Sequence, residues 1–65
     1  MSKRDQDYNL IAALHDQLED VERYEQYLQA AADCEECTGL WERLKRQTEE
    51  AITLIRQEIQ NHVGS

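Results

Sequence analysis

The ten residues AADCEECTGL, at positions 31–40, decide the fold because they interrupt two long helical patterns. Asp33 and Glu36 have the spacing of a capping box, in which the first side chain accepts an N–H group of the helix and the second reaches back to the cap. Thr38 is a second candidate cap, because Gly39 weakens a helix that runs through it by about 1 kcal/mol. The stretch therefore predicts a turn over about residues 33–38.

Upstream of this turn, apolar residues recur at gaps of three and four, with one interruption at Glu25. This spacing predicts a helix over about residues 5–32, capped by Asp5 or Asp7. The apolar stripe consists of Ile11, Leu14, Leu18, Val21, Leu28 and Ala32. It is widened by Tyr8, Leu10, Tyr24, Tyr27 and Ala31. A surface of this width indicates contact with more than one neighbouring helix.

Downstream of the turn, a second stripe predicts a helix over about residues 38–62. It consists of Cys37, Leu40, Trp41, Leu44, Ala51, Ile52, Ile55, Ile59 and Val63, with Leu54 beside it. The stripe has one polar interruption, at residues 47–48.

A turn this short makes the two predicted helices antiparallel. Folding the chain back on itself then places Glu19 level with about Thr48, and Glu22 level with about Lys45. We expect Thr48 to be a small residue in the seam between the helices. Its hydroxyl is expected to donate to the carbonyl of Leu44, one helical turn earlier.

The chain has 65 residues, no proline and two glycines, and it is rich in residues that favour helices. Ordering a chain of this length costs roughly 100 kcal/mol, and two helices alone bury only one stripe each. The sequence therefore predicts one all-α domain over residues 1–65, an antiparallel helical hairpin that pairs as a homodimer into a four-helix bundle. The predicted oligomer interface consists of Leu14, Leu18, Val21, Tyr24, Leu28, Leu40, Trp41, Leu44, Ile52, Ile55 and Ile59.

The net charge of −7 argues against binding to nucleic acid or to an anionic membrane, both of which require clustered lysine and arginine. The acidic surface suits a basic protein partner instead. No apolar run approaches the roughly 20 residues of a membrane span, and the first residues lack the apolar segment of a signal peptide. We expect a cytoplasmic protein with reduced cysteines.

Cys34 and Cys37 form a CxxC pair at the expected start of the second helix. Unpaired amides there lower a thiol pKa, which favours redox exchange or metal binding, whereas the neighbouring carboxylates raise it. The pair supplies two of the four ligands of a structural zinc site, so two chains would have to meet at their turns. Three interpretations stay open: a disulfide, a shared zinc site, or a structural role in which Cys37 is a small seam residue and Cys34 is incidental to the turn.

Glu19, Glu22 and Glu25 follow one another at intervals of one helical turn. Carboxylates that project from helices into a bundle are the ligands of di-iron sites. The alternative is that Glu19 and Glu22 flank the seam in solvent, while Glu25 lies near an open end beside Arg43.

The remaining candidates have simpler interpretations. His15 and His62 are expected to be exposed flanking residues. Tyr24, Tyr27 and Trp41 are expected to anchor the core or an interface, because aromatic side chains bury a large area.

The stretch from about Leu10 to Ile59 resembles a half-length ferritin-like protein of the rubrerythrin and encapsulated-ferritin type. The similar segments are LEDVERYEQY at 18–27, AAAD at 30–33, LWERL at 40–44 and EEAITLI at 49–55. The resemblance implies that two hairpins pair around two iron ions, which are bound by a Glu of the first helix and an ExxH motif of the second.

Carried across to this sequence, the Glu of the first helix corresponds to Glu19, with Glu22 and Glu49 as further carboxylates for a metal. The ExxH positions fall at Thr48 and Ala51, or one residue later, and neither alignment supplies the histidine. We predict a non-enzymatic protein that acts through homo-oligomerisation and protein–protein interaction, and the sequence leaves open whether it binds a cofactor. The alternative is a metal-binding or redox protein of ferritin-like descent that uses these carboxylates or the cysteine pair.

Overall fold

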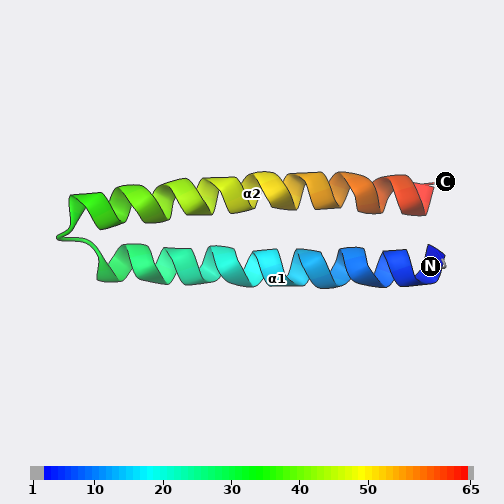
Figure 1. The fold of residues 1–65 in the computed structure, drawn as a ribbon, viewed down its shortest axis with the longest axis horizontal. Helices are drawn as coiled ribbons and strands as arrows, with labels where there is room; N and C mark the ends of the chain where they lie inside the picture. The colour runs from blue at the N-terminus through cyan, green and yellow to red at the C-terminus, as the bar shows by residue number, and fades with distance from the viewer. Residues whose placement is uncertain (1–2, 65) are drawn as a thin grey trace.

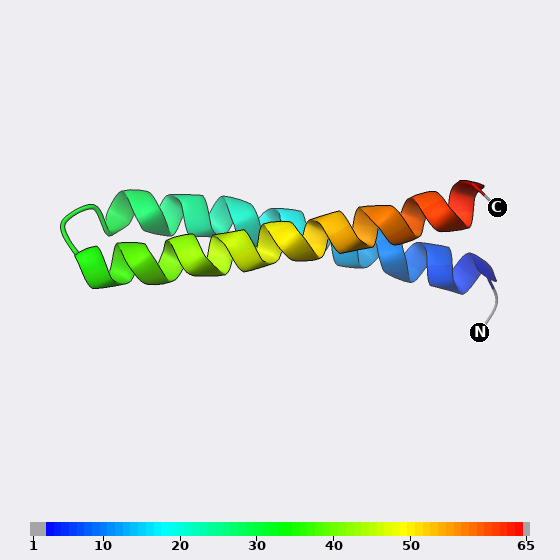
Figure 2. The same ribbon diagram turned by 90° about the horizontal axis from the view of Figure 1, so that it is seen from above.

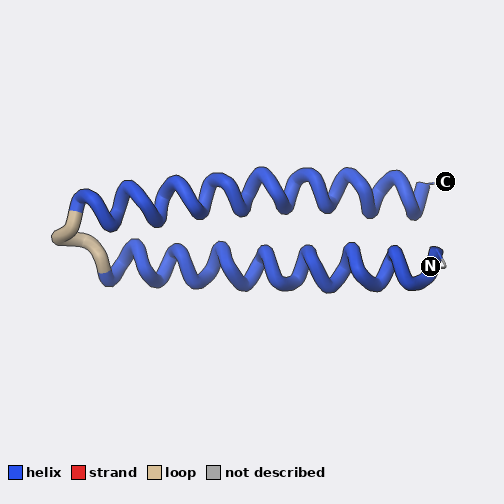
Figure 3. The backbone as a smooth tube through the Cα atoms, in the orientation of Figure 1, coloured by secondary structure: helices blue, strands red, loops and turns tan. Residues whose placement is uncertain are grey.

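The computed structural model describes residues 3–64, with the side chains of residues 5–62. It has two α-helices, α1 (Lys3–Ala30) and α2 (Glu35–Gly64), joined by a turn at residues 31–34 (Figure 1; Figure 3). They run antiparallel and cross near the middle of a hairpin 48 Å long (Figure 2). No strand occurs in residues 3–64, so the predicted all-α helical hairpin is confirmed.

The turn is held by hydrogen bonds that converge on Ala31 and Cys34. The Cys34 amide donates to the Ala31 carbonyl (2.9 Å), and the Thr38 hydroxyl donates to the same carbonyl (2.9 Å). The Cys37 amide donates to the Cys34 sulfur (3.2 Å). This last bond has the geometry of a helix N-cap, in which a side-chain atom accepts the N–H group three residues later.

The prediction that Asp33 or Thr38 caps the second helix is therefore wrong, because Cys34 is the cap. The Cys34 sulfur is one bond from Cβ, as a serine hydroxyl is, so it reaches the same amide. Consequently α1 ends at Ala30 instead of about residue 32, and α2 begins at Glu35 instead of about residue 38.

Two contacts at opposite ends of the hairpin show the register of the helices. Thr38 is bonded to Ala31 beside the turn, and His62 Nδ1 lies 3.2 Å from Asp7 Oδ1 at the open end. The same register places the following pairs level along the seam: Leu10 and Ile59, Leu14 and Ile55, Gln17 and Ile52, Val21 and Thr48, Leu28 and Trp41.

This register corrects the predicted one by two residues. Thr48 is level with Val21 instead of Glu19, and the Lys45 ammonium pairs with Glu25 (3.6 Å) instead of lying level with Glu22. The difference arises because the chain folds back at Cys34 and not at Asp33.

The seam of α1 is rotated relative to the predicted stripe. Its half-buried residues are Leu10, Leu14, Gln17, Val21, Tyr24 and Leu28, followed by Ala31 in the turn. Ile11 and Leu18, which belong to the predicted stripe, are 60% and 41% exposed. The observed rotation brings Tyr24 onto Trp41 and leaves the Glu25 carboxylate in solvent, which avoids the cost of burying it.

The seam of α2 consists of Thr38, Trp41, Lys45, Thr48, Ile52, Ile55, Ile59 and His62. Thr48 is 9% exposed, and it is the one buried residue among residues 5–62. Its hydroxyl donates to the Leu44 carbonyl (2.9 Å), which confirms that part of the prediction. Cys37 is exposed and Cys34 is half-buried, so the interpretation of Cys37 as a seam residue is wrong.

The single hairpin has no closed apolar core. No apolar side chain among residues 5–62 is buried. The accessible surface is 5250 Å², whereas a compact monomer of 7.7 kDa exposes about 4,300 Å². Neither helix contains a segment within residues 3–64 that is long and apolar enough to cross a membrane.

Candidate interaction surface and cysteine turn

One line of α2 presents apolar side chains outside the seam. We call this line the leucine face, and it consists of Leu40, Leu44, Gln47, Ala51 and Leu54. Leu40 and Leu54 are 49% and 64% exposed, whereas Leu44 and Ala51 are half-buried. The line contains no charged residue over four helical turns. This absence of charge is typical of the centre of a protein interface.

Three of the four exposed large apolar residues of α1 lie on the other side of the hairpin. They are Tyr8, Ile11 and Leu18, which we call the α1 face. Ile11 and Leu18 each follow a seam residue by one position, whereas the apolar members of the leucine face each precede one. Two antiparallel helices are related by a two-fold axis perpendicular to the plane that contains both. Residues that precede seam residues therefore lie on one face of the hairpin in both helices, and residues that follow seam residues lie on the opposite face.

The two faces differ in their charged neighbours. Glu42, Glu49 and Arg56 follow seam residues of α2, so they border the α1 face. On the leucine-face side, Asp16, Asp20 and Arg23 of α1 precede seam residues, and Arg23 is paired with Asp20 at 3.1 Å. The leucine face itself is uncharged from Leu40 to Leu54, whereas the line of the α1 face continues into Glu22, so the leucine face is the more continuous apolar surface.

Three aromatic side chains close the seam near the turn. Trp41 stacks on Tyr24, with ring centroids 6.0 Å apart, and it contacts Tyr27 at 4.9 Å. Tyr24 and Tyr27 meet edge to face at 6.2 Å. These contacts agree with the predicted role of the three residues as anchors, because paired aromatic rings stabilise beyond the area they bury.

A shallow depression of about 370 Å³ connects the aromatic cluster to the cysteines. Its lining consists of Tyr27, Ala30, Ala31, Cys34, Cys37 and Trp41. Because Tyr27 and Cys37 both precede seam residues, this depression opens on the side of the leucine face.

Cys34 and Cys37 are free thiols with different environments. Hydrogen bonds from the thiol of Cys37 and then from its amide lower the pKa of Cys34. The Cys37 thiol donates in this pair, so the same interaction raises the pKa of Cys37. Cys34 is consequently the thiol that ionises first, although it is the less exposed of the two.

The carboxylates predicted as metal ligands are exposed. Glu19 lies 3.4 Å from His15 Nε2 and 3.5 Å from Arg23, while Glu22 and Glu49 point from different helices. No group of three or more His, Cys, Asp or Glu side chains in the described part of this chain is arranged to hold a metal ion. A site built from them would need ligands from a second chain.

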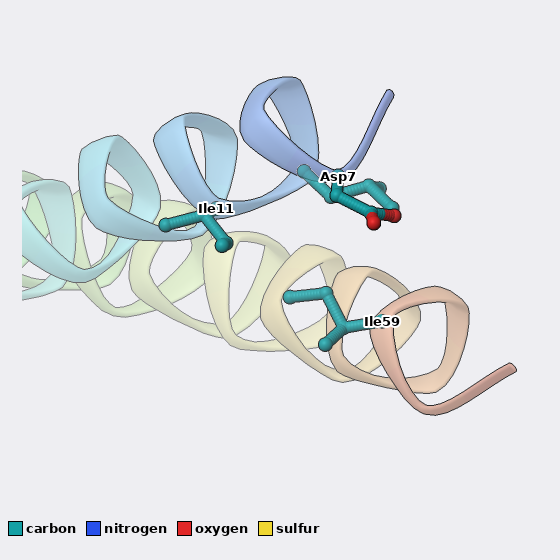
Figure 4. A pocket seen from close by; sticks show the side chains of 4 residues that line it. Asp7, Ile11 and Ile59 are labelled. Atoms are coloured by element: carbon teal, nitrogen blue, oxygen red, sulfur yellow. The ribbon is translucent and has the colours of Figure 1, made fainter. Parts of the chain in front are cut away.

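The two histidines differ from one another. His15 is exposed, as expected, whereas His62 is half-buried in the seam, which corrects the prediction for it. Glu25 is paired with Lys45 and not with Arg43. Beside His62, the open end of the hairpin has a depression of about 140 Å³ lined by Asp7, Leu10, Ile11 and Ile59 (Figure 4).

Most of the residues predicted for an oligomer interface lie in the seam within one chain. These are Leu14, Val21, Tyr24, Leu28, Trp41, Ile52, Ile55 and Ile59. Leu18, Leu40 and Leu44 lie outside it. The predicted stripe of the second helix combines the seam residues with Leu40, Leu44 and Ala51 and does not separate them as a line of their own, although the gaps of four and three from Leu40 to Leu54 run unbroken through Gln47.

Comparison of the chain with protein families, with curated proteins and with solved structures found no match.

Proposed function

We propose that this chain is a non-enzymatic helical module that acts through homo-oligomerisation and protein–protein interaction. One observation carries the proposal: no apolar side chain of residues 5–62 is buried in the single hairpin. Half-buried contacts along one seam offset little of the entropy lost on ordering two long helices. Covering the remaining apolar surface with a second chain supplies the missing burial.

The accessible area supports an interface of ordinary size. The surface of 5250 Å² exceeds that of a compact monomer of equal mass by roughly 900 Å². A standard interface covers about 800 Å² of each partner. In the proposed assembly, two hairpins pack as a four-helix bundle, and the acidic outer surface is left for other protein partners.

Sedimentation equilibrium of the full chain tests this proposal. We expect a mass of two chains at micromolar concentration, and a thermal midpoint that rises with protein concentration because folding is linked to association. A folded species of single-chain mass, with a midpoint independent of concentration, would contradict homo-oligomerisation.

A redox or metal-binding function is the second candidate, and it rests on the thiol pair. Cys34 accepts two hydrogen bonds from Cys37, which favours its thiolate, and thiolates are both nucleophiles and metal ligands. Metal analysis of untagged protein separates the two candidates. Stoichiometric zinc would assign the pair as ligands shared between chains, and stoichiometric iron or manganese would assign a ferritin-like carboxylate site.

A further inference from the structure

We infer that the leucine face is the self-association surface, and that it meets the leucine face of a second copy with the two α2 helices antiparallel. This inference rests on the proposed homo-oligomerisation and adds the face and the orientation. The α1 face, on the opposite side of the hairpin, stays outside the interface.

The choice of face follows from charge. The leucine face has no ionised group between Leu40 and Leu54, whereas the line of Ile11 and Leu18 on α1 continues into Glu22. Ile11 and Leu18 lie on the side that Glu49 and Arg56 border. A partner that covers the α1 face would bury Glu22 within its line, whereas the charged residues beside the leucine face, such as Arg43 and Glu50, lie at its edges.

The choice of a second copy follows from self-complementarity. A two-fold interface brings the same patch of two chains together. Each residue must therefore pack well against the residue that reversal of the patch places opposite it. The leucine face meets this requirement, because reversing the line about its midpoint, which lies between Leu44 and Gln47, sets each leucine against a smaller or a polar residue. Reversal sets Leu40 of one copy near Ala51 of the other, and Leu54 near Cys37.

The antiparallel orientation follows from the flanking charges. Arg43 and Glu50 are exposed on the outer edge of the leucine face, two helical turns apart. Antiparallel α2 helices place Arg43 of each copy near Glu50 of the other. Parallel helices in register would place the two copies of Arg43 on opposite edges of the interface, and the two copies of Glu50 likewise, so this pairing of opposite charges would be lost.

Matched substitutions on the two faces test the choice of face. Leu54→Glu and Leu40→Glu change the leucine face, and Ile11→Glu and Leu18→Glu are their controls of similar exposure on the α1 face. Sedimentation equilibrium gives the dimer Kd of each full-length variant. We expect Leu54→Glu and Leu40→Glu to raise Kd by about a hundredfold or more, because each dimer buries the new charge twice. The two controls are expected to stay within about threefold of wild type.

The outcomes separate the two levels of the proposal. Loss of the dimer in the controls alone, or equally in both sets, would overturn the choice of face while leaving homo-oligomerisation standing. A monomeric wild type would overturn the proposed oligomerisation itself. Circular dichroism at high protein concentration checks that each variant remains helical.

Disulfide trapping tests the orientation. In Cys34→Ser the only thiol is that of Cys37, and serine keeps the helix cap. Oxidised glutathione is expected to link Cys34→Ser/Leu54→Cys into covalent dimers, because Cys37 of one copy lies near position 54 of the other. Cys34→Ser/Leu18→Cys is the matched control and should stay unlinked. Efficient covalent dimers of Cys34→Ser alone would indicate parallel helices and overturn the orientation.

Discussion

The half of the hairpin beside the turn and the half at its open end are held by different forces. Beside the turn, the seam contains the ring contacts of Trp41 and the hydrogen bonds of Thr38 and Cys34. At the open end, the seam consists of aliphatic layers such as Leu10 with Ile59, a polar contact between Asp7 and His62, and a depression of about 140 Å³ (Figure 4).

This difference indicates where the structure is most strongly specified. Hydrogen bonds and ring stacking depend on angle as well as distance, so they fix the register of the helices. Aliphatic contacts stabilise according to the apolar area they bury, and because they are not directional they do not fix a register. The ends of helices also fray. We therefore expect the turn half to determine the hairpin and the open half to open first.

The largest difference between the halves is expected from Trp41→Ala against Ile59→Ala. Trp41→Ala removes two ring contacts and is expected to destabilise the protein by about 3 kcal/mol. Ile59→Ala removes a half-buried aliphatic side chain and is expected to cost about 1–2 kcal/mol. Urea unfolding at one fixed protein concentration measures both values. A larger loss for Ile59→Ala would place the stabilising half at the open end.

The sequence predicts the hairpin because its evidence is local. The gaps of three and four, the absence of proline and the break at residues 33–34 each act within a few residues. The rotation of α1 is not local. Stripes through Leu10 and Gln17 or through Ile11 and Leu18 share Leu14 and have the same period, and contact of Tyr24 with Trp41 selects the first.

The candidate sites could likewise be predicted only as far as local patterns determine them. Cysteine is an uncommon cap, so residue preference favoured Asp33 over Cys34. A shift of one residue at the turn then moves every pairing along the seam, including those of Glu19 and Lys45. The leucine face separates from the predicted stripe only after the seam is known, since its members are adjacent to seam residues.

A smaller effect is expected at the cap of α2. Cys34→Ala leaves the Cys37 amide without its side-chain acceptor and is expected to cost about 1 kcal/mol. Cys34→Ser replaces the sulfur by a hydroxyl with the same reach and is the matched control, with an expected change of less than about 0.5 kcal/mol. Thermal unfolding under reducing conditions measures the pair. Equal losses in both variants would show that the sulfur acts otherwise than as a cap.

The thiols also make the turn sensitive to pH. Because the pKa of Cys34 is lowered in the folded chain, its contribution to stability is present above the unfolded pKa, near 9.0, and is lost as pH falls through the lowered value. The pKa of Cys37 is raised, so its contribution is present below 9.0 and is lost as pH rises through the raised value. The combined contribution of these two thiols to stability therefore rises with pH up to about 9.0 and falls above it.

Alkylation detects the same order of ionisation. Below pH 9, iodoacetamide is expected to modify Cys34 before the more exposed Cys37, because the thiolate is the nucleophile. Peptide mass spectrometry of briefly treated wild type assigns the site. Unfolded protein in urea is the control, and there the two rates should become similar. Faster modification of Cys37 in the folded protein would mean that exposure outweighs the hydrogen bonds at Cys34.

The smallest effect is expected at Thr48, where the two halves of the seam meet. Its hydroxyl donates only to the Leu44 carbonyl of its own helix (2.9 Å), and a bond of this kind adds little to stability. Thr48→Val keeps the shape of the side chain and replaces the hydroxyl with an apolar group level with Val21, so the expected change lies between zero and about 0.5 kcal/mol of stabilisation. Thr38→Val is the matched control on the same helix, because the Thr38 hydroxyl crosses the turn to Ala31 (2.9 Å) and its loss leaves that contact unmade. We expect Thr38→Val to cost about 1 kcal/mol in urea unfolding. Destabilisation of similar size in both variants would mean that the middle of the seam is specified by polar contacts as the turn is, and that the boundary between the two halves lies nearer the open end.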